Sequence, residues 1–178
     1  MNIIIYGSKY GTARQYAEHL GRQTNTEVKS FDDINNINTY NTIVYIGALY
    51  AGGVMGMKET LSRIDTLEDK KLVIATVGLA DPDDTQNIET IRDNIKRQLP
   101  ATLYEHADIY HLRGGIDYSR LSLKHKTMMW MLYKKTIKIP ESERNAEVRA
   151  MIETYGKKVN FFDMKSLECL TDYLKPDQ

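Results

Sequence analysis

The sequence predicts an α/β fold: a doubly wound parallel sheet of five strands with helices on both faces. Short apolar runs rich in isoleucine and valine alternate with segments of helical period, which is the strand–helix order of this class. The runs are apolar almost throughout, as expected for parallel strands that are covered on both faces. The 178 residues suit one domain, and no boundary is visible, so we expect a single domain over residues 1–178.

Each predicted strand is a short run of β-forming residues. The five strands are expected at Asn2–Tyr6, Glu27–Phe31, Thr42–Ala48, Lys71–Val77 and Ala107–Leu112. Helical spacing follows the first, third and fourth strands, at Ala13, Tyr16, Ala17 and Leu20, at Met57, Leu61 and Ile64, and at Ile88, Ile91, Ile95 and Leu99. The last third is expected to be helical at Ser119–Tyr133, Glu141–Tyr155 and Ser166–Leu174.

Charge and hydropathy indicate the cellular compartment and the classes of binding partner that we expect. Lys and Arg number 24, as do Asp and Glu, so the net charge is zero and nucleic acid is not an expected partner. No apolar run reaches the roughly 20 residues that cross a bilayer, and no leader pattern is visible, so we expect a cytoplasmic protein. The single Cys169 lies near Leu167 and Leu170, and we expect it to be a buried structural thiol.

The turn after the first predicted strand carries the strongest functional signal. Ser8 and Thr12 offer hydroxyl groups, Gly11 permits close approach of the backbone, and free amides at a helix N-terminus attract anions. The turn lacks the glycine spacing of a dinucleotide site and the Gly-Lys-Ser/Thr ending of a nucleotide P-loop, which argues against NAD and ATP. A mononucleotide phosphate needs neither feature. The alternative is an ordinary turn in which Ser8 and Thr12 only cap the helix.

A second glycine-containing loop, residues 47–53, follows the third predicted strand. Tyr50 offers a ring that can stack on a planar ligand, and the Gly52-Gly53 pair can bring peptide groups against the ring edge. Taken alone, an aromatic residue beside two glycines is more often just a turn.

A third loop, residues 76–82, follows the fourth predicted strand. Gly78 leaves room for a ligand, and Asp81 either belongs to the site or caps the next helix. The carboxyl ends of parallel strands meet at one edge of the sheet, where doubly wound folds bind their ligands. The joint occurrence of three such loops therefore predicts one binding crevice.

These loops resemble those of flavodoxin-domain proteins, in the branch that includes menaquinone-dependent protoporphyrinogen oxidases, and the resemblance runs nearly end to end. It implies the strand order 2-1-3-4-5 and FMN as the cofactor. The residues it implies for the FMN phosphate are Ser8, Lys9, Tyr10, Gly11, Thr12 and Ala13. Those implied for one face of the isoalloxazine ring are Leu49, Tyr50, Ala51, Gly52 and Gly53, and those for its other side are Thr76, Val77, Gly78, Leu79, Ala80 and Asp81.

Two details of the resemblance qualify the prediction. Ala13 stands where flavodoxins usually have a threonine, which removes one hydroxyl contact to the phosphate. The segment Leu112–Tyr118, leading into Met128–Met131, is similar to a stretch of the oxidase branch that small electron-carrier flavodoxins lack.

The resemblance implies an FMN-dependent oxidoreductase that transfers electrons to or from a quinone or a porphyrinogen-like substrate, since the flavin brings its own redox chemistry. One alternative is a non-enzymatic electron carrier that docks with a redox partner protein. Another is an interaction module with weak FMN binding. Flavodoxin carriers tend to be acidic, so the zero net charge favours the enzyme. No catalytic side chain and no metal site are expected, and the backbone around Gly52 is predicted to contact the flavin edge.

The methionine-rich segment Leu121–Tyr133 leaves two interpretations open. Four lysines surround it: Lys124, Lys126, Lys134 and Lys135. Either the helix faces the core with solvated lysines, or its surface meets a quinone, a tetrapyrrole, a membrane face or a partner protein.

Overall fold

The computed structural model, in which residues 1–50 and 52–175 are described, confirms the doubly wound α/β fold. The main sheet has the order β2-β1-β3-β5-β6, and all four neighbouring pairs on this path are parallel. Its strands are β1 (Asn2–Gly7), β2 (Glu27–Ser30), β3 (Thr42–Tyr50), β5 (Lys71–Gly78) and β6 (Asp108–Arg113). The short β4 (Gly53–Val54) pairs antiparallel to the end of β3. Without β4, this is the predicted order 2-1-3-4-5.

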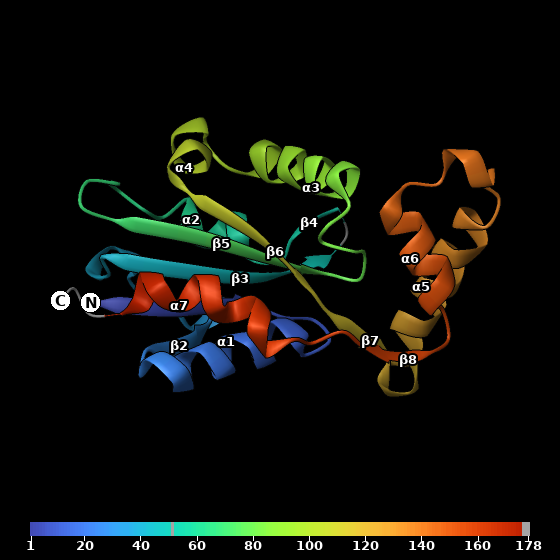
Figure 1. The fold of residues 1–178 in the computed structure, drawn as a ribbon, viewed down its shortest axis with the longest axis horizontal. Helices are drawn as coiled ribbons and strands as arrows, with labels where there is room; N and C mark the ends of the chain where they lie inside the picture. Colours follow the sequence, from blue (N-terminus) through green and yellow to red (C-terminus); the bar gives the residue numbers. More distant parts are fainter. Residues whose placement is uncertain (51, 176–178) are drawn as a thin grey trace.

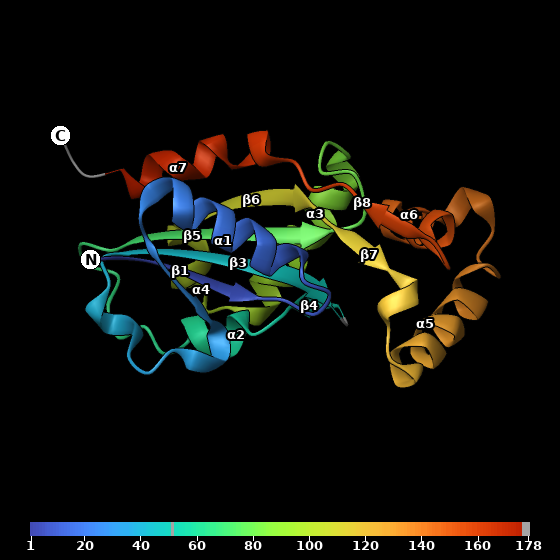
Figure 2. The same ribbon diagram turned by 90° about the horizontal axis from the view of Figure 1, so that it is seen from below.

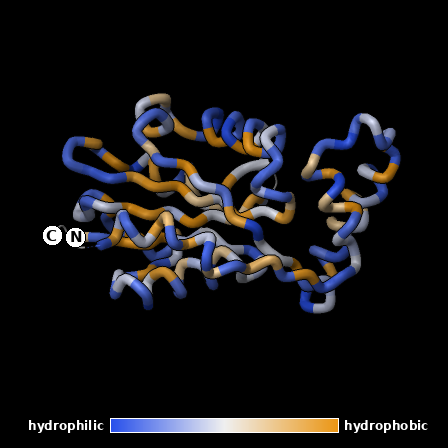
Figure 3. The backbone as a smooth tube through the Cα atoms, viewed as in Figure 1, coloured by the Kyte–Doolittle hydropathy of each residue, from blue (hydrophilic) through white to orange (hydrophobic). Residues whose placement is uncertain are grey.

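Helices cover both faces of the sheet (Figures 1 and 2). On one face lie α1 (Thr12–Thr24) and α7 (Glu168–Leu174). On the other lie α2 (Met57–Leu61), α3 (Thr85–Gln98) and α4 (Ala101–His106). Successive side chains of a strand point to opposite faces, so β1 gives Ile3 and Ile5 to one core and Ile4 to the other. Figure 3 shows the resulting apolar bands along the strands.

Residues 115–160 form a separate lobe beyond the carboxyl edge of the sheet (Figure 1). It contains the antiparallel strands β7 (Gly115–Asp117) and β8 (Lys158–Asn160), and the helices α5 (Leu123–Thr136) and α6 (Ala146–Thr154). A small apolar cluster holds it together, with Ile116, Tyr118, Met129 and Met151 at its centre. Short 3₁₀ turns in the chain lie at Phe31–Asp33, Ile37–Thr39, Tyr118–Arg120, Glu141–Glu143 and Met164–Leu167.

One buried tyrosine of α1 binds the chain just before and just after the lobe. The hydroxyl of Tyr16 donates to the carbonyl of Arg113 at 2.8 Å and accepts from the amide of Asp163 at 3.0 Å. The amide of Phe161 also donates to the carbonyl of Gly114 at 3.1 Å. We call residues 113–117 and 158–163 the lobe neck. These bonds join the two segments of the lobe neck to each other and to α1.

The structure corrects several predicted elements. The helix expected from Ser119 begins at Leu123, because Ser122 caps it by accepting from the amide of His125. The helix expected from Glu141 begins at Ala146, where Asn145 caps it. The sequence pattern did not predict α4 or the β7–β8 ribbon. Cys169 is exposed, so the prediction of a buried thiol is wrong: in α7 the apolar face is formed by Leu170 and Leu174.

Within residues 1–50 and 52–175, none of the helices combines the length and the apolar character needed to cross a bilayer.

Candidate functional site

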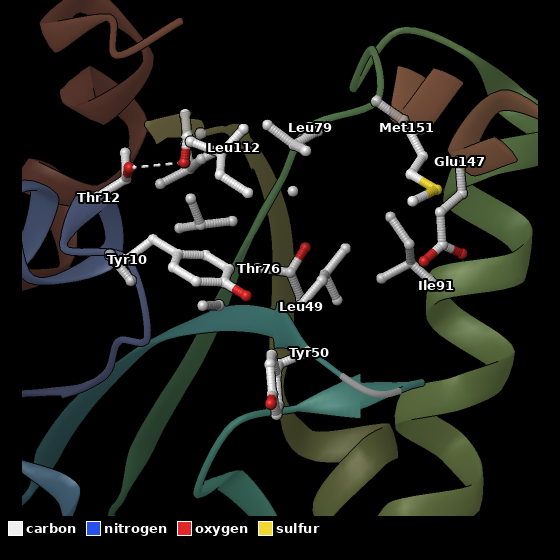
Figure 4. A pocket seen from close by; sticks show the side chains of 18 of the residues that line it. Tyr10, Thr12, Leu49, Tyr50, Thr76, Leu79, Ile91, Leu112, Glu147 and Met151 are labelled. Atoms are coloured by element: carbon white, nitrogen blue, oxygen red, sulfur yellow. Dashed lines mark hydrogen bonds between the residues drawn. The ribbon is translucent and has the colours of Figure 1, made fainter. Parts of the chain in front are cut away.

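A cavity of about 380 Å³ lies at the carboxyl edge of the main sheet, between the strand ends and the lobe (Figure 4). All three predicted loops contribute to its wall. The predicted residues that line it are Ser8, Tyr10, Thr12, Ala13, Leu49, Tyr50, Thr76, Val77, Gly78, Leu79 and Ala80. Its volume falls within the roughly 300–1,000 Å³ typical of small-molecule sites.

The first loop presents an open helix N-terminus to this region. Gly11 precedes α1 with φ 96° and ψ −19°, a left-handed conformation that favours glycine. No side chain in the described part of the chain caps α1, so the predicted capping by Ser8 or Thr12 does not occur. Instead, Ser8 Oγ accepts from the amide of Gly11 at 3.2 Å, and the Thr12 hydroxyl donates to the carbonyl of Gly115 at 3.4 Å. The first-turn amides lack intrahelical acceptors and carry the positive end of the helix dipole.

Lys9 and Gly11 belong to this loop but do not line the cavity wall. The Lys9 side chain is exposed, and its Nζ lies 5.4 Å from the centroid of the Tyr50 ring. This cation–π contact joins the first loop to the second. Tyr50 in turn contacts the lobe, because its hydroxyl lies 3.8 Å from the sulfur of Met128.

The second loop is a hairpin turn between β3 and β4. Leu49 pairs with Val54 and Tyr50 with Gly53, so both lining residues are held by the sheet. Gly52 is exposed with φ 80°, and Ala51 lies outside the described residues. At Gly53, an added Cβ would lie 2.9 Å from Gln98 Oε1, which accepts from the amide of Val54. Close packing against α3 is therefore one reason for a glycine at this position.

The third loop is shaped by packing as well. A Cβ at Gly78 would lie 2.8 Å from Leu49 Cδ1, so the glycine lets the second and third loops meet. Asp81 is exposed and accepts from the amide of Asp83 at 2.9 Å. The alternative that Asp81 caps the next helix is wrong, because Asp84 caps α3 by accepting from the amide of Asn87 at 3.0 Å.

Two buried polar atoms on lining residues have no hydrogen-bond partner among the described residues. They are Oη of Tyr10 and Nε2 of His111. The other ring nitrogen of His111, Nδ1, lies 2.8 Å from the hydroxyl of Thr76. Burial, with a smaller contribution from Arg92, lowers the pKa of His111 to about 4, so the imidazole is neutral at pH 7. Because a buried unpaired polar atom is costly, these two atoms indicate a ligand with polar groups.

The remaining wall comes from residues that were not predicted as ligands. Ile91 and Asn87 of α3 lie on one side, and the lobe contributes Met128, Leu132, Glu147 and Met151 among others. The Gly114-Gly115 pair and the methionine run of α5 were visible in the sequence, but no local spacing indicated that they face the strand ends. Among the described residues, no group of His, Cys, Asp or Glu is arranged to hold a metal ion.

One family model and several solved structures are similar to this chain. The model of the flavodoxin domain matches residues 3–143. A search of curated protein sequences finds no match. The chain is similar to the structure of a single-substitution mutant of flavodoxin from Pseudomonas aeruginosa, with 17% identity over 76% of this chain and 96% of that chain and a TM-score of 0.40.

Two further structures are similar to the chain. A putative flavoprotein from Bacteroides eggerthii shares 14% identity over 78% of this chain and 98% of its own, with a TM-score of 0.44. A flavodoxin mutant from Fusobacterium nucleatum, solved with bound flavin mononucleotide, shares 14% identity over 65% of this chain and 76% of its own, with a TM-score of 0.37. The assignment rests on the sequence match, which spans most of the chain. The chain belongs to the flavodoxin-domain family.

Proposed function

We propose that the cavity binds FMN and that the protein is an FMN-dependent oxidoreductase. The observation that carries this proposal is the convergence of the loops after β1, β3 and β5 on one cavity at the carboxyl edge of the sheet. Doubly wound folds bind their ligands at this edge. The family membership and the FMN-bound flavodoxin from Fusobacterium nucleatum support the choice of cofactor.

The residues present fit such a cofactor. The Ser8 hydroxyl and the first-turn amides of α1 would hold the phosphate, and the Thr12 hydroxyl would join them by giving up its bond to the carbonyl of Gly115. Tyr50 from the second loop and Leu79 from the third would lie against the ring system. The unpaired Oη of Tyr10 gives the wall a hydrogen-bonding group, which fits a ligand that is polar at its edges.

When bound, FMN supplies electron and hydride transfer, and the chain's own residues bind it, orient it and limit the access of water. The lobe is the part that favours an enzyme over a carrier. A carrier needs an exposed flavin edge for docking, whereas here α5 and α6 contribute to the cavity wall. We propose a quinone or a porphyrinogen-like substrate, as in the protoporphyrinogen oxidase branch that the chain resembles. The electron carrier and the weakly binding interaction module are the competing functions.

Two experiments separate these functions. Titration of the purified protein with FMN, followed by flavin absorbance and fluorescence, is expected to show saturable binding. No binding would leave only the interaction module. Stopped-flow oxidation of the reduced, FMN-loaded protein by menaquinone, and its reduction by protoporphyrinogen, then test the enzyme. Fast reaction with a carrier protein alone would favour the electron carrier.

The outward face of α5 supports a second proposal, contact with an anionic membrane surface. Leu123, Trp130 and Met131 are exposed there by 82%, 51% and 55%, so the helix does not simply face the core. Lysines flank this apolar stripe on the same helix: Lys124, Lys126, Lys134 and Lys135. Exposed apolar side chains between lysines suit a helix that lies in a lipid interface.

Liposome flotation tests the membrane proposal. The protein is expected to float with vesicles that contain anionic lipid, and a Trp130→Ala, Met131→Ala double variant is expected to float less. Equal recovery in the bottom fraction with and without anionic lipid would contradict it.

A further inference from the structure

The end of the cavity that is remote from the phosphate loop forms what we call the lobe chamber. At that end lie Ile91 of α3 and Glu147 and Met151 of α6, and we count with them as its walls Met128 and Leu132, which line the same cavity from α5, Met128 beside Tyr50. Figure 4 shows Ile91, Glu147 and Met151 on the opposite side of the cavity from Tyr10 and Thr12. The groups that suit a phosphate, the loop hydroxyls and the N-terminus of α1, are all at the other end.

The lobe chamber is chemically unlike the phosphate end. Four of its five wall residues are apolar, and two are methionines, whose flexible thioethers adapt to flat ligands and make favourable contacts with aromatic rings. Met151 is 7% exposed and packs in the lobe core, which fixes the inner wall. The chamber therefore favours a planar aromatic body over a flexible polar one.

Charge restricts the ligand further. No Lys or Arg is among the described residues that line the cavity, and Glu147 is the one carboxylate there. Arg149 lies on the same helix, but its guanidinium is 3.4 Å from a carboxylate oxygen of Asp84, at the start of α3. His111 is neutral near pH 7 and adds no positive charge. A carboxylate, sulfonate or phosphate in the lobe chamber would thus face Glu147 with no cation to pair with.

We propose that the lobe chamber binds a second, planar aromatic ligand that carries no negative charge, with any positive charge held beside Glu147. The inference rests on the proposed function in one respect, since it assigns FMN to the loop end of the cavity. It narrows the two substrate classes proposed above to the quinone, because a carboxylated tetrapyrrole, like a nicotinamide nucleotide, brings anionic groups.

The test uses three probes that share one ring system: 5-methylphenazinium, phenazine and phenazine-1-carboxylate. Equilibrium dialysis against the FMN-loaded protein measures their dissociation constants from probe absorbance. The cation is expected to bind about fivefold more tightly than the carboxylate, a modest ratio because Glu147 is exposed. Glu147→Lys is expected to reverse the order of these two probes and to leave phenazine nearly unchanged. Equal binding of the three probes, or the same order in Glu147→Lys, would overturn the charge argument.

A pair of variants on α5 tests the location. Leu132 lines the lobe chamber and is 44% exposed, so a larger side chain is accommodated there without buried strain. Leu132→Trp is expected to weaken phenazine binding at least severalfold. Met131→Trp, the next residue, is 55% exposed and does not line the cavity, and it is expected to bind phenazine like the parent protein. Similar effects of both variants would contradict the location.

Competition separates this inference from the proposed function. If FMN displaces phenazine from the protein, the lobe chamber is part of the flavin's own site and the inference is wrong. If FMN itself fails to bind, the proposed function fails, and the same probe series on the FMN-free protein still decides the charge preference of the lobe chamber.

Discussion

Replacing Gly11 by alanine isolates the backbone of the phosphate loop. Gly11 has φ 96°, and a Cβ placed on it would meet no heavy atom within 4 Å, so the change causes no clash. The cost is conformational, about 1–2 kcal/mol for a left-handed alanine. The loop can relieve this strain by rotating towards negative φ, which turns the first-turn amides of α1 away from the phosphate. A loss of about 1.4 kcal/mol in binding corresponds to a tenfold weaker affinity for FMN.

Gly156→Ala is the matched control. Gly156 is exposed in the lobe with φ 74°, and a Cβ there would also meet nothing within 4 Å. Both variants are expected to lower Tm by about 2–8 °C, from about 2–4 °C per kcal/mol at this chain length. Only Gly11→Ala is expected to weaken FMN binding, measured by quenching of flavin fluorescence. If Gly11→Ala lowers Tm but binds FMN as Gly156→Ala does, the assignment of the phosphate to this loop is refuted.

Four further changes test separate parts of the site. Ala13→Ser restores a hydroxyl beside the phosphate loop, and FMN titration is expected to show about twofold to tenfold tighter binding, from the net worth of one hydrogen bond; unchanged affinity would mean that the hydroxyl does not reach the ligand. Tyr16→Phe leaves the carbonyl of Arg113 and the amide of Asp163 without the Tyr16 hydroxyl as partner, which is expected to lower the free energy of unfolding by about 1–3 kcal/mol and to speed amide exchange in the lobe neck. Unaltered exchange would show that the hydroxyl does not hold the neck. Burial lowers the pKa of His111 from 6.5 in the unfolded chain to about 4 in the folded protein, so between pH 6.5 and pH 4 the unfolded chain binds one more proton and the folded state loses stability as the pH falls. His111→Gln is expected to flatten this part of a Tm–pH profile. Parallel profiles of variant and parent would contradict the assignment. Gly52→Ala is expected to shift the midpoint potentials of bound FMN or its affinity, and unchanged values for both would rule out contact between this peptide and the flavin edge.

The parallel main sheet with helices on both faces could be predicted because its strands are almost purely apolar. Ile3, Ile4 and Ile5 are fully buried, and three consecutive buried side chains occur only in a strand that is covered on both faces. The resemblance to flavodoxin-domain proteins then supplied the strand order. The structure of residues 115–160 was harder to predict, since the three-residue strands β7 and β8 pair across 41 to 45 positions of the chain, from Asp117 with Lys158 to Gly115 with Asn160. Pairing of this kind depends on tertiary packing and leaves no local period in the sequence.

The site also divides into a part that local sequence patterns predict and a part that depends on tertiary packing. Residues on the three loops were predicted because each loop follows a buried strand directly, so the topology places them at one edge. The part of the wall formed by α5 and α6 depends on where the lobe sits, which is influenced by contacts such as those of Tyr16 with both segments of the lobe neck. In the sequence the methionines of α5 cannot be told apart, although in the structure Met129 is buried and Met131 is exposed. Composition alone does not show which of them faces the cavity.

In the proposed function, the loops after β1, β3 and β5 form one FMN site. The most direct measurement is a titration of the purified protein with FMN, followed by quenching of flavin fluorescence and by the flavin absorbance bands, with riboflavin titrated in parallel. We expect saturable one-to-one binding of FMN and much weaker binding of riboflavin, because riboflavin lacks the phosphate that the first loop would hold. Equal affinity for the two flavins, or fluorescence of FMN that stays unchanged in excess protein, would contradict it.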